Sequence, residues 1–172
     1  MYNNKIFVIA LLLLFPTSLV NANITVNFLE GAPKDRFVVT NTGQCSLQAL
    51  QVDIDLTDTA GELIFDTTAT GAGVDVFQPF EVSSGDIRLN GKARINDGDK
   101  VLSIIISSIQ ARASVSFTID VDDTLANSER GMIIVSGAEI EGGRVTATHG
   151  SLGGSGTFDR NSNASINMPK CV

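Results

Sequence analysis

Apolar and polar residues alternate with a period of two in four segments of the chain. The apolar positions of these segments are Ile24, Val26 and Phe28; Phe37 and Val39; Leu50, Val52, Ile54 and Leu56; and Val115, Phe117, Ile119 and Val121. Successive side chains of a strand point to opposite faces, so this alternation predicts strands that bury one face. No segment of ten residues or more has a convincing helical period.

Shorter apolar segments between turn signals predict further strands. They cover residues 62–66, 74–77, 80–82, 86–89, 93–95, 101–107, 132–135 and 144–147. Turn dipeptides such as Asn90-Gly91 and Gly142-Gly143 separate them. Frequent short strands with Gly and Asp turns predict an all-β fold, an antiparallel β-sandwich of the immunoglobulin-like type. A jelly roll or a small barrel is the alternative.

The first 22 residues have the pattern of a signal peptide. Lys5 precedes an apolar block from Ile6 to Phe15, and the small residue Ala22 ends a cleavage-site pattern, so the mature chain is expected to begin at Asn23. As a helix the apolar block would span roughly 15 Å, about half the hydrocarbon core of a bilayer. We therefore expect a protein that is secreted, periplasmic or extracellular, with no membrane span in the mature chain.

Composition divides the rest of the chain into two parts. Residues 23–147 contain the predicted strands and are expected to form the β-sandwich domain. Residues 148–172 are rich in Gly, Ser and Asn and predict a loop or tail, to which Phe158 and Ile166 could add one edge strand.

The two cysteines of the chain, Cys45 and Cys171, predict one disulfide in an oxidising compartment. The bridge would tie the C-terminal segment back to the loop after the second strand. It would close a loop of about 127 residues, for which chain entropy predicts a stabilisation of about 4 to 5 kcal/mol.

The net charge of the chain and its small number of reactive side chains restrict the classes of function that it can have. Lys and Arg number 12 against 19 Asp and Glu, a net charge of −7, so the chain has no basic surface for nucleic acid. The single histidine, His149, lies in a Gly/Ser-rich segment near Ser151 and Ser155, without a Gly-x-Ser-x-Gly turn. We therefore expect a protein that is not an enzyme, with a hydrolase as the alternative.

Acidic residues interrupt two of the predicted strands. Asp53, Asp55, Asp120 and Asp122 fall on the faces opposite the core positions, where they could form a solvated acidic surface. Oxygen ligands grouped in this way could also hold Ca²⁺. Asp120, Asp122 and Asp123 are the candidate calcium ligands, since the last two end a strand in a turn where backbone carbonyls can join them.

Four segments resemble those of a known family: LEGAPKDRFVVTNTGQC (29–45), LIFDTTATGAGVDVFQPFEV (63–82), VSFTIDVDDT (115–124) and IIVSGAEIEGGRV (133–145). They are similar to small exported bacterial proteins described as aggregation-factor-core-like, after the core protein of sponge aggregation factors. The resemblance implies an extracellular, calcium-dependent role in adhesion, aggregation or matrix, with self-association or an extracellular protein or glycan as partner. The alternative function is a periplasmic or secreted carbohydrate- or protein-binding module.

Overall fold

The structure, a computed structural model, describes residues 22–31, 33–68, 70, 78–92, 94–125 and 135–168, and all regular structure in them is strand. The strands are β1 (Ala22–Leu29), β2 (Asp35–Asn41), β3 (Leu47–Asp55), β4 (Ile64–Asp66), β5 (Glu81–Ser84), β6 (Ile87–Leu89), β7 (Val101–Ile109), β8 (Ser114–Asp122), β9 (Arg144–His149), β10 (Leu152–Thr157) and β11 (Asn163–Met168). Within these ranges no apolar helix of membrane-spanning length occurs.

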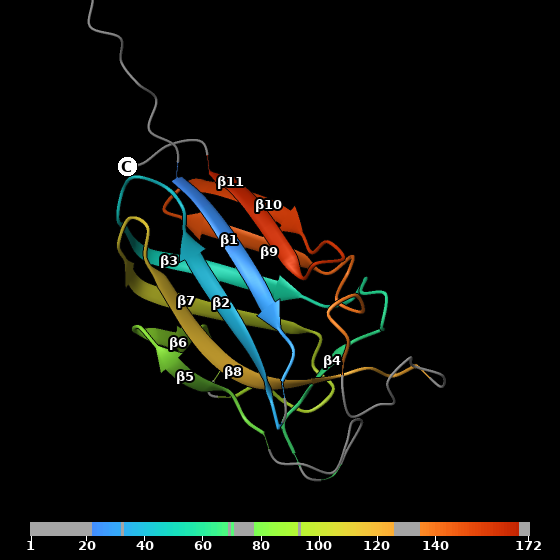
Figure 1. Cartoon of the computed structure of the whole chain (residues 1–172). Helices are drawn as coiled ribbons and strands as arrows, with labels where there is room; N and C mark the ends of the chain where they lie inside the picture. Colours follow the sequence, from blue (N-terminus) through green and yellow to red (C-terminus); the bar gives the residue numbers. More distant parts are fainter. Residues whose placement is uncertain are drawn as a thin grey trace, which may run out of the picture.

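The strands form two antiparallel sheets that pack face to face (Figure 1). The first sheet has the order β11-β1-β2-β8-β4, and β5 also pairs with β8. The second sheet has the order β10-β9-β3-β7-β6. The predicted antiparallel β-sandwich is confirmed, and its immunoglobulin-like subtype stays a prediction.

The alternating apolar positions of the sequence meet between the two sheets. Phe37 of β2 stacks on Phe117 of β8 with ring centroids 5.3 Å apart, and it also contacts Phe65 and Phe158. The other fully buried side chains of large volume are Ile24, Leu47, Leu50, Ile54, Leu56, Leu63, Leu102 and Ile104. The period of two in the sequence therefore identified the core face of β1, β2, β3 and β8 correctly.

Some of the shorter predicted strands differ from the structure. Residues 94 and 95 are not in a strand, because this part of the chain turns toward β4 instead of pairing along its length. The predicted strand at 74–77, most of the one at 132–135, and residue 93 lie outside the described residues.

The prediction of a loop or tail after His149 is wrong for β10, which is an integral strand of the sandwich, whereas β11 is the edge strand that Ile166 was expected to add. β10 pairs with β9 along its whole length, and β11 pairs with β1. A Cβ atom on Gly154 would lie 2.5 Å from the carbonyl oxygen of Asn167, and one on Gly156 would lie 2.3 Å from that of Ser165. The glycines thus allow the backbones of two edge strands to approach each other and close this side of the sandwich.

The ends of the described chain lie beside the segment that contains Cys45. Met168 is opposite Ala22 in the β1–β11 register, and the amide of Thr42 donates to the carbonyl of Asn23 at 2.8 Å. Cys45 is not a free thiol, but Cys171 and residues 1–21, most of the predicted signal peptide, lie outside the described residues. The disulfide between Cys45 and Cys171 stays a prediction, and so does the export signal.

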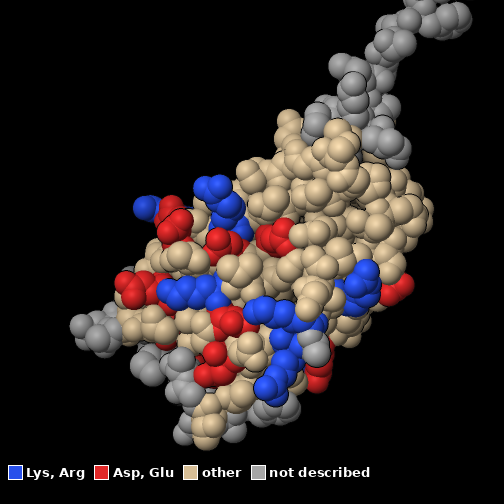
Figure 2. Space-filling view, turned by 180° about the vertical axis from the view of Figure 1, so that it is seen from behind, with Lys and Arg blue, Asp and Glu red and all other residues tan. Residues whose placement is uncertain are grey.

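Charged side chains of both signs are interspersed on the face shown in Figure 2. Acidic and basic groups alternate over the lower part of this view, and its upper part carries few charges. This face therefore offers no continuous basic patch of the kind that binds phosphates.

Replacement of Gly156 by alanine should destabilise the fold, because the added methyl group would overlap the backbone of β11. Overpacking of this kind costs about 1 to 3 kcal/mol. The free energy of unfolding in denaturant measures the effect. Ser155→Ala, an exposed position in the same strand, is the matched control and should remain within about 0.5 kcal/mol of the unchanged protein. Equal stability of the two variants would contradict the close contact of β10 with β11.

Candidate metal centre

Strand β8 is buried on both of its faces. Ser116, Thr118, Asp120 and Asp122 alternate with the core residues of β8, yet each is at most 9% exposed. The expectation that the acidic groups of this strand face solvent is therefore wrong. A period of two shows which side chains share a face, but whether another segment covers that face depends on the tertiary fold.

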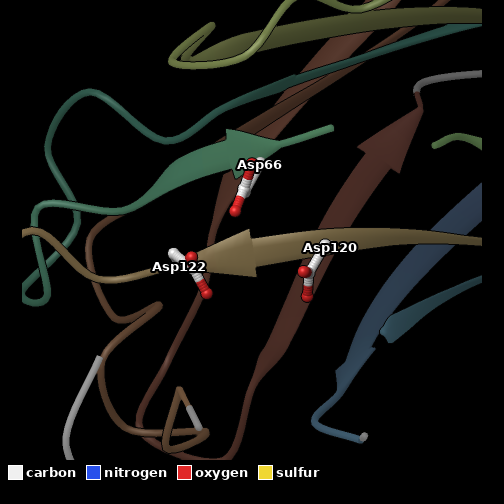
Figure 3. A group of neighbouring side chains, drawn as sticks. All are labelled: Asp66, Asp120 and Asp122. Atoms are coloured by element: carbon white, nitrogen blue, oxygen red, sulfur yellow. The ribbon is translucent and has the colours of Figure 1, made fainter. Parts of the chain in front are cut away.

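Three aspartates converge at the end of β8. Asp66 of β4 is directly opposite Asp120 in the β4–β8 register, and Asp122 is opposite Ile64. One carboxylate oxygen of each aspartate lies within 4.8 Å of those of the other two. Figure 3 shows the carboxyl group of Asp66 directed toward the space between Asp120 and Asp122.

Strand β4 is short, and hydrogen bonds on both of its edges hold it in place. One edge pairs with β8. On the other edge, the amide of Phe65 donates to the carbonyl of Asp99 at 2.9 Å, and the amide of Gly98 donates to the carbonyl of Phe65 at 2.9 Å. The segment around Asp97 leads into β7 of the second sheet. Asp66 is thus positioned by contacts to both sheets.

A fourth buried aspartate, Asp35, lies beside this group at the start of β2. Its two carboxylate oxygens accept hydrogen bonds from the amides of Gly31 and Val121, each at 3.0 Å. The first bond closes the turn between β1 and β2, and the second satisfies an amide of β8 next to the point where β2 begins. Asp35 therefore has a structural role that hydrogen bonds account for.

Burial raises the pKa values of the aspartates in this region. Loss of solvation is the largest cause for Asp35, whose pKa rises to about 8 despite its two backbone hydrogen bonds. Loss of solvation, followed by contacts with Asp97 and Asp122, raises the pKa of Asp66 to about 8. Loss of solvation and the charge of Asp122 raise the pKa of Asp120 to about 7, against a smaller opposing effect of Lys34. Negative charge is thus unfavourable here unless a cation compensates it.

The hydrogen bonding of Asp66 also points to a cation. Its side chain is 1% exposed, and oxygen Oδ2 has no hydrogen-bond partner. Buried polar atoms without a partner are rare in folded proteins, and a bound ion is one of the recognised explanations. Calcium binds oxygens at 2.3 to 2.6 Å, so two of its ligands can be about 4.8 Å apart. The group contains no nitrogen or sulfur ligand, as a calcium site requires.

The other acidic residues considered in the sequence lie elsewhere or do not join the group. Asp123 is buried, and its Oδ1 accepts from the amide of Leu125 at 3.1 Å, but it is not among the three converging carboxylates. Asp53 and Asp55 belong to β3 in the second sheet. Asp53 accepts hydrogen bonds from Gln51 and Ser103, and Asp55 accepts from the amide of Thr57. The structure thus joins two of the three predicted calcium ligands to an aspartate that the sequence did not indicate.

The sequence contained only weak signals for Asp35 and Asp66, the two aspartates that its analysis did not single out. Asp35 is in phase with the buried positions Phe37 and Val39, so a carboxylate on the core face was visible in the alternation. Asp66 ends a predicted strand, but nothing in its spacing indicates that this strand pairs with β8.

The histidine considered for a hydrolase lies at the end of β9, where it is half-buried and opposite Leu152. Ser151 and Ser155 are exposed. Among the described residues no hydrogen bond joins His149 to a serine or to an acidic side chain.

A cavity of about 370 Å³ lies next to the aspartate group. Its polar lining residues are Thr67, Thr68, Arg94, Asn96 and Asp97. Thr67 follows Asp66 directly, and its hydroxyl donates to the carbonyl of Ile95 at 3.2 Å. The group of carboxylates is thus close to a concave, polar surface.

Without divalent cations, the free energy of unfolding should decrease as the pH rises from about 5 to about 8. The unfolded chain releases the protons of Asp35, Asp66 and Asp120 near the ordinary pKa of 3.8, whereas the folded chain holds them to about 7 or 8. Denaturant unfolding in chelator at several pH values measures this slope. Asp120→Asn should flatten it, and the exposed Asp86→Asn should not. A stability that rises over this range would contradict the raised pKa values.

Comparison with models of known protein families gives no match to this chain, and comparison with curated proteins gives none either. The resemblance to the aggregation-factor-core-like proteins therefore stays a prediction.

Proposed function

We propose that this chain is an exported, non-catalytic β-sandwich that acts in adhesion, aggregation or extracellular matrix and that binds Ca²⁺ through Asp66, Asp120 and Asp122. The observation that carries the proposal is the convergence of three buried carboxylates, one of which has an oxygen without a hydrogen-bond partner. Extracellular modules bind calcium with dissociation constants of about 0.1 to 1 mM, which suits the medium outside the cell.

Electrostatics favours a divalent cation at this position. Two or more carboxylates in a desolvated space repel one another, and each must stay protonated or share a cation. A calcium ion bound by all three would replace the protons and complete the coordination of Oδ2 of Asp66. Carboxylate, carbonyl and water oxygens are the ligands that calcium prefers.

Burial of the site determines how calcium would act. Asp66 and Asp122 are at most 2% exposed, so a bound ion would contact the protein and not a second molecule. Calcium would therefore promote adhesion by stabilising this end of the sandwich. Export is supported by the signal-peptide pattern of residues 1–22 and by the predicted bridge between Cys45 and Cys171.

The cavity beside the aspartates favours a second candidate function, a carbohydrate- or protein-binding module. Ligand sites are commonly concave and hold a few convergent polar groups. The hydroxyls of Thr67 and Thr68, the guanidinium of Arg94 and the amide of Asn96 provide such groups. Binding of a glycan by the purified protein, without self-association in calcium, would favour this function over the first.

Calcium should raise the thermal midpoint of the protein. At a concentration of about one hundred times the dissociation constant, binding adds about 2.7 kcal/mol to the free energy of unfolding. Asp120→Asn should remove most of this gain, because it replaces a ligand. In chelator the same variant should be at least as stable as the parent, because it removes the repulsion between buried carboxylates. Differential scanning calorimetry with calcium and with chelator measures both effects.

Asp86→Asn is the matched control, since Asp86 is an exposed carboxylate in the turn between β5 and β6. It should keep the full calcium gain. An unchanged midpoint of the parent protein in millimolar calcium would remove the metal site from the proposal.

Light scattering tests the adhesive role directly. We expect the molar mass of the purified protein to increase with concentration in calcium and to return to that of a monomer in chelator. The Asp120→Asn variant should stay monomeric in calcium, because the calcium-stabilised end is lost. A protein that binds calcium but is monomeric under every condition would contradict self-association.

A further inference from the structure

Strand β6 leaves one edge of the second sheet open. It is the last strand in the order β10-β9-β3-β7-β6, and among the described residues it pairs only with β7. The carbonyl of Asp86 and the amide of Asn90 are both hydrogen-bonded to β7, each at 2.9 Å. Main-chain groups of successive residues in a strand point to opposite sides, so those of Ile87 and Leu89 point to the free edge.

The other terminal strands of the two sheets are covered or irregular. β10 and β11 lie against each other, and β4 is hydrogen-bonded on both of its edges. β5, which pairs with β8, has an irregular register between Val82 and Ser84. An irregularity of this kind hinders the pairing of a strand with another chain. Within the described part of the chain, β6 is therefore the regular edge to which a further strand can be added.

We propose that β6 is a self-association surface, at which a second copy of this chain adds its own β6 in antiparallel orientation and joins the two second sheets into one continuous sheet. This inference rests on the proposed function, because it names the surface through which the chains associate. A two-fold axis would relate the two copies, and an interface of this kind uses the same residues on both sides.

The charges beside the free edge are complementary to those of a second copy. Asp86 and Arg88 are exposed, and neither side chain has a hydrogen bond or an ion pair within the described ranges. With the two-fold axis at Ile87, Asp86 of each copy is opposite Arg88 of the other. An axis at Arg88 would place two arginines opposite each other, which is unfavourable. Charge therefore favours the register centred on Ile87.

The same register satisfies the main-chain groups at the open edge. The amide and carbonyl of Ile87 would exchange two hydrogen bonds with those of Ile87 in the second copy, as in any hydrogen-bonded antiparallel pair. The side chains of Ile87 and Leu89 already pack against the core, so pairing needs no rearrangement of the sandwich. β5 contacts β6 at this side of the molecule and exposes Val82, which adds apolar surface (Figure 1).

The connection between β6 and β7 links this edge to the proposed calcium site. It contains Gly98, whose amide donates to the carbonyl of Phe65 in β4 at 2.9 Å, and Phe65 directly precedes Asp66. Calcium that stabilises β4 would therefore also hold the segment that follows β6. This link explains why self-association through β6 is expected to be stronger in calcium.

Reversal of the two charges tests the pairing without a change in the core. Asp86→Arg and Arg88→Asp should each weaken self-association in calcium roughly tenfold or more, because each variant places two like-charged pairs in the interface. An equimolar mixture of the two variants should recover the affinity, because one variant is basic at both positions and the other is acidic at both. Sedimentation equilibrium of each variant and of the mixture measures the dissociation constants.

Arg36→Asp is the matched control, since Arg36 is an exposed arginine in β2 of the other sheet. It should leave the dissociation constant unchanged. If the parent protein is monomeric in calcium at every concentration, the proposed self-association and this inference both fail. If the parent associates but the charge reversals have no effect, or the mixture is no stronger than either variant alone, the proposed function stands and β6 is not the surface.

Hydrogen exchange in the unchanged protein locates the surface without any variant. Exchange at the amides of Ile87 and Leu89 should slow as the protein concentration rises in calcium, because these donors become bonded to the second copy. The amide of Asn90 is already bonded to β7 and should change little, so it is the internal control. Exchange at Ile87 and Leu89 that is equally fast in the monomer and in the associated protein would contradict pairing through β6.

Discussion

The burial of β8 on both faces is the constraint on which this end of the molecule depends. One face joins the apolar core through Phe117 and Ile119, and the other carries Asp120 and Asp122, which are at most 9% exposed. A desolvated carboxylate must be protonated, hydrogen-bonded or paired with a cation. Asp35 meets this requirement with two backbone amides. The carboxylates of Asp66, Asp120 and Asp122 instead converge within 4.8 Å of one another, and this difference separates a structural acid from a candidate ligand.

The sandwich covers exposed strand edges in different ways on its two sides. At one end, glycines let β10 approach β11 until the backbones are in contact. At the other end, the short strand β4 lies between β8 and the β6–β7 connection, with Asp66 at its end. The first closure is made by backbone shape and needs no ion. The second gathers acidic side chains, so its stability is expected to depend on pH and on cations.

Much of the fold was accessible from the sequence, because strands buried on one face repeat their apolar residues every second position. The core rows of β1, β2, β3 and β8 follow directly from that period. The same reasoning failed for β10, where glycine takes the inward positions and no apolar alternation marks the strand. Glycine has low strand propensity, so the pairing with β9 and the close approach to β11 explain why this segment is a strand.

For the site, the sequence by itself determined that Asp120 and Asp122 share one face of a strand, since that follows from the geometry of any extended chain. It did not determine that this face is covered, nor that Asp66 lies opposite Asp120, because pairing between strands far apart in the chain depends on how the sheets assemble. Only the tertiary structure placed Asp66 beside β8. The reason is physical: side-chain alternation is local, whereas desolvation and the meeting of like charges arise from contacts between distant segments.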